Sequence, residues 1–244
     1  MIQPKEYFDR YLAWKRHTDP KSSAKFTYEA YSAMDLNMLL HETDFNVPGA
    51  LEELGERYLF GLDVDVDVDK ALELFQQAAD AGHPDAYHML ADVYRTDQHG
   101  RQDLDRYFEL LPVAAQHGSW KSMFNLACAY YRGKLGYDGH GYNLDHTAAL
   151  EWSLKSVDMT HDLLQLFFSR PCTQNLKDYF GDVYDTFVRA VFAAAKQYMD
   201  GDGTDKDPDK ARELVSSAQE FHKKCLGMDC NQFTFLLNKL GEKV

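Results

Sequence analysis

Hydrophobic residues recur at helical spacing along most of this 244-residue chain. The clearest stretch follows Asp67, and its apolar positions are Ala71, Leu74, Phe75, Ala78 and Ala79. An aspartate directly before such a pattern accepts hydrogen bonds from free backbone amides, and its charge suits the positive end of a helix. Ala81-Gly82 is a typical stop signal. We therefore predict a helix that begins after Asp67 and ends near Gly82.

The loop before this helix reads GLDVDVDVDK, so four aspartates alternate with valines. A calcium loop of the EF-hand type needs glycine at its sixth position and glutamate at its twelfth. Neither a start at Asp63 nor one at Asp65 places those residues there. We therefore expect no metal site, and we interpret the run as a loop that ends in the helix cap Asp67.

The segment that precedes this loop is repeated along the chain. Ala50-Leu-Glu-Glu-Leu-Gly-Glu-Arg-Tyr aligns with the segments that begin 36 residues later, at Ala86, and 36 residues later again, at Ser122. The aligned positions are Leu54, Leu90 and Leu126, then Gly55, Ala91 and Ala127, then Tyr58, Tyr94 and Tyr130. A fourth copy begins at Ala190, and its loop GDGTDKDPDKA places Asp207 where the first copy has Asp67. Such a period is typical of stacked helical hairpins.

These segments resemble the Sel-one-like repeat, a relative of the tetratricopeptide repeat whose unit reads A-x3-LG-x2-Y-x2-G-x-G-V-x2-D-x2-KA before a second helix. Residues 50–82 fit closely, with Asp63 in place of the second loop glycine. Residues 86–118 lack the loop motif, and residues 122–157 carry a glycine-rich insertion. The resemblance implies an all-α fold, a right-handed α/α superhelix (solenoid) of helix-turn-helix repeats with helical caps.

The domain organisation follows from these copies. We expect an N-terminal helical cap over residues 1–49, with helices near 4–16 and 27–42, and repeats one to three over 50–158. Residues 159–189 form either a divergent repeat or a helical insertion, with helical stretches at 162–168 and 176–189. Repeat four and a C-terminal cap, including a helix over 231–240, occupy residues 190–244.

Acidic residues are concentrated in the early repeats. The net charge is −13, and residues 50–121 hold 15 acidic against 6 basic residues. Nucleic-acid binding depends on basic patches and is therefore disfavoured, whereas a basic protein partner fits the charge. No apolar run is long enough for a membrane span, and no secretory signal is evident, so we expect a cytoplasmic protein. We expect a monomer or weak dimer.

No catalytic or cofactor motif is present in the sequence. The histidines form no HExxH pattern, the four cysteines form no CxxC pair, and neither a phosphate-binding loop nor GxSxG occurs. We assign His83 and His117 to surface turns, and we expect reduced thiols. The chain is therefore predicted not to be an enzyme and to bind no cofactor, with an enzyme site within residues 159–189 kept as the alternative.

The resemblance also indicates where a partner would bind. In solenoids of this type the concave groove is formed mainly by the first helix of each repeat. The corresponding positions here predict the partner-binding residues Glu52, Glu56, Leu59, His88, Asp92, Arg95, Phe124, Tyr131, Phe192 and Lys196. The alternative is that some of them only cover neighbouring helices.

These observations together favour a non-enzymatic protein-binding solenoid. Its most specific form is a bacterial immunity or antitoxin-type protein that neutralises a basic toxin through an acidic groove, because complementary charge speeds association. The alternative is a scaffold, adaptor or regulator in signalling or host interaction.

Overall fold

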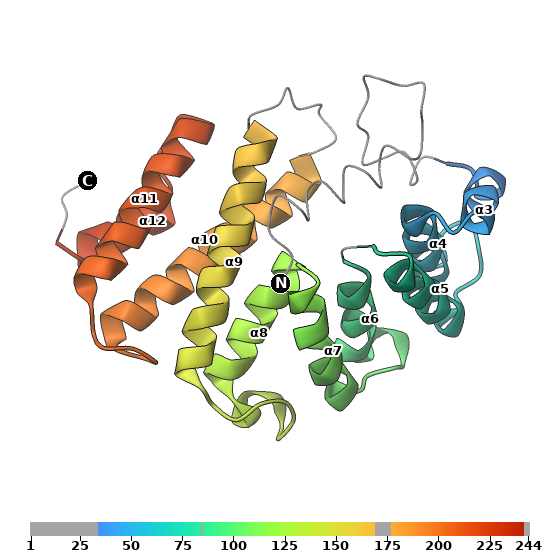
Figure 1. Ribbon diagram of the computed structural model, residues 1–244, viewed down its shortest axis with the longest axis horizontal. Helices are drawn as coiled ribbons and strands as arrows, with labels where there is room; N and C mark the ends of the chain where they lie inside the picture. Colours follow the sequence, from blue (N-terminus) through green and yellow to red (C-terminus); the bar gives the residue numbers. More distant parts are fainter. Residues whose placement is uncertain (1–33, 84, 169–176, 242–244) are drawn as a thin grey trace. The chain divides into compact units, whose positions relative to one another are not determined.

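The computed structural model describes residues 34–83, 85–168 and 177–241, and within these ranges it contains helices and turns but no strand (Figure 1). This confirms the predicted all-α class. The predicted helix at 4–16 lies outside the described residues. The chain divides into two compact units, one formed mainly by residues up to Ser122 and the other mainly by residues from Met123 onward. Each unit is described by itself.

The first unit is a series of short helices, each packed against the next. In chain order these are α3 (Leu36–Asp44), α4 (Pro48–Phe60), α5 (Val68–Asp80), α6 (Ala86–Arg95) and α7 (Leu104–Gln116), as Figure 1 shows. Two apolar clusters hold α3 to α6 together, one around Leu51 and Leu54 and the other around Phe75 and Leu90. Successive pairs thus share a continuous core, as expected of helical hairpins that cannot bury their apolar faces alone.

The second unit contains longer helices. Helix α8 (Trp120–Arg132) crosses from the first unit, and α9 (His146–Phe168), α10 (Lys177–Asp200), α11 (Pro208–Leu226) and α12 (Asn231–Lys239) follow. Helices α9 and α10 have 23 and 24 residues, against 13 in α5. The helical stretches predicted at 162–168 and 176–189 therefore belong to these two long helices and are not separate elements.

A small residue brings the two helices of the first repeat close together. A Cβ atom added at Gly55 of α4 would lie 2.6 Å from Cε1 of Phe75 on α5. Phe75 has no exposed surface, so its ring cannot easily move aside. Glycine at this position thus permits the close approach of α4 and α5.

The four aspartates of the first loop have different structural roles. Asp63 has φ of 60°, a left-handed conformation that Gly203 shares in the fourth repeat at φ of 79°, and its carboxylate lies 3.3 Å from the buried guanidinium of Arg57. Asp67 caps α5, as predicted, by accepting a hydrogen bond from the Lys70 amide at 2.9 Å. Asp65 is exposed. Asp69, in the first turn of α5, accepts hydrogen bonds from Arg101 of the next repeat.

The same aspartate cap recurs in all four repeats. Each capping carboxylate accepts from an amide at 2.9 Å, and the pairs are Asp67 with Lys70, Asp103 with Arg106, Asp145 with Ala148, and Asp207 with Lys210. The backbone amide of each cap also donates to the carbonyl oxygen of a tyrosine in the last turn of the first helix, in turn Tyr58, Tyr94, Tyr130 and Tyr198. Residues 86–118 thus retain the aspartate cap, although the rest of the loop motif is lost.

The predicted helix over 27–42 also needs correction in its described part. Asp35 is extended, with ψ of 158°, and its carboxylate accepts from the amides of Asn37 and Met38. It is therefore the cap of α3, which begins at Leu36. A helix running through this position would leave the aspartate no role as a cap.

Candidate partner-binding surface

Three ionisable residues of the first unit lie around the carboxyl group of Glu56, and we call the four residues the Glu56 cluster: Glu52, Glu56, His83 and Lys121. Glu52 and Glu56 are four residues apart on α4, so both point from the same face of the helix. His83 comes from the turn between α5 and α6, and Lys121 from the start of α8. The electrostatic influence of all three neighbours reaches Glu56.

His83 is buried, which corrects its assignment to a surface turn. Only 6% of it is exposed, and its Nε2 lies 3.0 Å from Oε2 of Glu52. Its Nδ1 accepts the amide hydrogen of Asp85, which leaves the proton on Nε2 facing Glu52. Burial alone lowers the pKa of His83, but the charge of Glu52 and the hydrogen bond to it raise that pKa above its ordinary value overall.

Glu56 has the most unusual environment of the predicted binding residues. Burial, followed by the negative charges of Glu52 and Glu53, raises its pKa to about 8, although Lys121 and His83 act in the opposite direction. Its carboxyl group makes no hydrogen bond or ion pair with any residue that the structure describes. At neutral pH this group therefore holds a proton and lacks a cationic partner in direct contact.

The three predicted binding residues of α6 differ in how far they are exposed to solvent. His88 is half-buried, its Nδ1 lies 3.0 Å from the hydroxyl oxygen of Ser122, and burial lowers its pKa. Asp92 and Arg95 form an ion pair at 2.6 Å with nearly half of each side chain exposed. Asp92 and Arg95 remain accessible, while His88 is partly engaged in packing.

Leu59 lies in the core. It is 6% exposed and packs with Ala71, Phe75, Leu90 and Val93. Its side chain therefore stabilises the contact between the first two repeats. For Leu59 the alternative given above applies, namely that some predicted positions only cover neighbouring helices.

The remaining predicted residues lie in the second unit. Phe124 is 7% exposed, with the guanidinium of Arg189 4.9 Å from its ring centre. The Tyr131 hydroxyl donates to Asp202 at 3.0 Å, and its ring stacks on His146. Phe192 is half-buried and Lys196 is exposed. Lys196 is thus the most accessible of these four residues.

Within the described residues, no three histidine, cysteine or acidic side chains are grouped so that they could hold a metal ion. Cys128, Cys225 and Cys230 are free thiols. In the same part of the chain, no helix combines the length and apolar character that a membrane span requires.

Stacked helical hairpins with a common aspartate cap define an all-α repeat protein. The Sel1 repeat family model matches residues 48–83, 120–161 and 188–218. The chain therefore contains Sel1 repeats, which confirms the resemblance found in the sequence. The second hairpin, α6 with α7, lies between the first two matched segments.

Two repeat proteins are among the solved structures that are similar to this chain. One is a protective antigen present in uropathogenic Escherichia coli strains that displays an SLR fold, with 16% identity and a TM-score of 0.46 over 99% of this chain. This chain spans only 57% of that protein's length. The other is a Sel1 repeat protein from Oxalobacter formigenes, with 25% identity and a TM-score of 0.43, covering 61% of this chain and 98% of that one.

Proposed function

We propose that this chain is a non-enzymatic protein-binding module in which the Glu56 cluster receives a basic side chain of the partner. The observation that carries the proposal is the half-buried Glu56 carboxyl, which has no hydrogen bond or ion pair with a described residue. A lysine or arginine of a partner would supply the missing cation. Sel1 repeats act as scaffolds for protein–protein interaction, and this supports the same function.

Binding of a cation at this position is coupled to loss of a proton. The approaching positive charge lowers the pKa of Glu56 from about 8, so the carboxyl ionises and forms a charge-assisted pair with the partner. The excess of acidic residues over 50–121 attracts a basic protein from a distance and speeds its association. Asp92 and Arg95 on α6 are accessible for further polar contacts.

The finer form of the proposal is a cytosolic immunity or antitoxin-type protein that covers a basic toxin. It is supported by the acidic early repeats and by the lack of a catalytic motif in the sequence. A scaffold or adaptor role is the second candidate, and in that role too the partner would bind at the Glu56 cluster.

The proposal is tested by capture of the partner from the native host with the tagged full-length chain. Glu56→Lys should lose a basic protein that the parent retains, because the added ammonium repels its cationic side chain. Glu73→Lys on α5 is the control, since it makes the same substitution at an exposed residue of the same repeat. Equal capture by the parent and both variants would refute the role of Glu56.

A further inference from the structure

Three exposed apolar side chains gather at the loop between α4 and α5. Phe60, Leu62 and Val66 are 50%, 53% and 61% exposed. A Cβ added at Gly61 would lie 2.8 Å from Cγ2 of Val66, which places Val66 directly beside the stretch that carries Phe60 and Leu62. The three exposed apolar side chains thus lie within residues 60–66, and Val66 folds back beside Gly61.

The fold itself does not require apolar side chains here. In the fourth repeat, the positions of Phe60, Leu62 and Val66 are occupied by Asp200, Asp202 and Lys206. Both loops nevertheless have glycine in a left-handed conformation at the helix end, Gly61 and Gly201. Both also end in the same aspartate cap. The exposed apolar residues are thus specific to the first loop.

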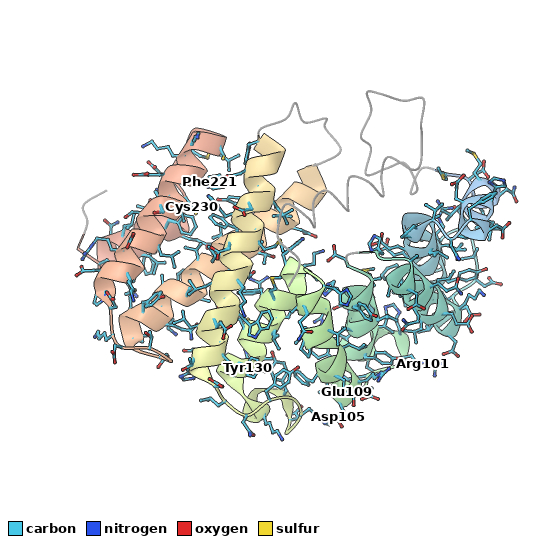
Figure 2. The ribbon with its side chains drawn as sticks, viewed as in Figure 1. Arg101, Asp105, Glu109, Tyr130, Phe221 and Cys230 are labelled. Atoms are coloured by element: carbon cyan, nitrogen blue, oxygen red, sulfur yellow. The ribbon has the colours of Figure 1, made fainter. Side chains whose placement is uncertain are left out.

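The corresponding loops of two other repeats are contact surfaces. In the fourth repeat, the Thr147 hydroxyl at the start of α9 donates to the Gly203 carbonyl oxygen at 3.0 Å. In the second repeat, Arg101 (labelled in Figure 2) donates to both carboxylate oxygens of Asp69 at the start of α5, at 2.6 and 2.5 Å. Each loop therefore touches the second helix of an earlier repeat. The first loop has no earlier repeat of this kind among the described residues.

Negative charge surrounds the apolar patch. The Asp63 side chain is 73% exposed, and Asp65 is exposed without a hydrogen bond or ion pair to any described residue. The neighbouring loop approaches through His99, whose ring centre lies 5.5 Å from that of Phe60. Residues 60–69 and 96–103 together contain six aspartates and one arginine. A ligand for this surface must therefore combine apolar and basic groups.

We propose that the first-loop patch, formed by Phe60, Leu62, Asp63, Asp65 and Val66, docks a segment of a partner protein in which apolar and basic side chains alternate. A second copy of this chain is disfavoured because each copy carries a net charge of −13. An anionic membrane surface is disfavoured for the same reason. The proposal goes beyond the function proposed above, because it concerns the loop and does not require the Glu56 cluster.

The test uses a fluorescein-labelled peptide of alternating lysine and leucine, titrated with the full-length chain while anisotropy is measured. The double variant Leu62→Ser/Val66→Ser should weaken binding by about tenfold, since it removes the apolar contacts. Asp65→Asn should also weaken binding and reduce its salt dependence. Leu144→Ser is the matched control, because Leu144 is 60% exposed in the loop before α9, and it should bind as the parent does.

Three results would overturn the proposal: no binding by the parent, equal binding by the parent and the double variant, or equal binding of a lysine–serine peptide. Thermal unfolding of each variant is recorded beside the titration. If the double variant is destabilised, Asp65→Asn decides, because its side chain contributes no described contact.

Discussion

The backbone amide of Asp103 donates to the carbonyl oxygen of Tyr94 at 2.9 Å, and the amide of Asp67 makes the same bond to Tyr58. This bond ties the end of each loop to the end of the helix before it. The aspartate side chain then caps the next helix. The second repeat thus closes its hairpin as the first does, although its loop has lost the glycine motif.

Removing the cap of the second repeat should destabilise the protein. Asp103→Ala should lower the free energy of unfolding by about 1 kcal/mol, the usual contribution of a helix N-cap. Asp67→Ala should cost about as much, and Asp65→Ala much less, because Asp65 is exposed and caps no helix. Urea unfolding gives the values. Equal midpoints for Asp103→Ala and the parent would contradict the capping role.

Gly55→Ala should destabilise the first repeat although alanine favours helices. The new methyl group would meet the buried Phe75 ring at 2.6 Å, and such overpacking costs about 1–3 kcal/mol against a propensity gain of roughly 0.5–1 kcal/mol. Gly181→Ala in α10 is the matched control, because its Cβ would have no neighbour within 4 Å. It should stabilise the protein by about 0.5–1 kcal/mol. A stabilising Gly55→Ala would show that α4 and α5 are less tightly packed than described.

Glu56 should make the stability of the protein fall as pH rises. The folded protein holds this proton up to a pKa of about 8, whereas the unfolded chain releases it near the ordinary 4.5. The folded state is therefore favoured at low pH, and this contribution is lost between about pH 4.5 and 8. Glu56→Gln should remove this loss and exceed the parent in stability above pH 8 by at least about 1 kcal/mol.

The measurement is urea unfolding of both proteins across that pH range. The parent must be compared with Glu56→Gln because the raised pKa of His83 adds a further loss of stability as pH increases above 6.5, the ordinary pKa of histidine. Parallel pH profiles for the parent and the variant would show that Glu56 ionises normally.

Local sequence signals predicted much of the fold. The helical spacing and the aspartate before it located α5 and its cap, and the aligned leucines and tyrosines located the repeats. The Asp103 cap was missed because the glycine that matches Gly61 is replaced by Asp97, although the position of Asp103, 36 residues after Asp67, was a sufficient signal. Periodicity also gave no sign that α9 and α10 extend so far.

The candidate site was harder to predict because it depends on packing. Glu52 and Glu56 were identified from their register in the repeat, but no sequence signal indicated that His83, which lies in a turn, is buried against Glu52 of α4. The raised pKa of Glu56 depends on its burial and on the charges of Glu52 and Glu53, and it is opposed by Lys121 and His83, which come from different elements. Leu59 occupies a position in the repeat that was predicted to face the groove, yet residues of the second repeat cover it.

The central claim is that a basic partner binds at the Glu56 cluster and displaces a proton. The most direct test is calorimetric titration of the captured partner at pH 7 in two buffers of different ionisation enthalpy. The parent should release up to one proton on binding, because the partner's cation lowers the pKa of Glu56 from about 8. Glu56→Gln should bind the partner more weakly and release fewer protons, while Glu73→Gln should match the parent in affinity and in proton release. Identical proton release and affinity for the parent and Glu56→Gln would contradict the account.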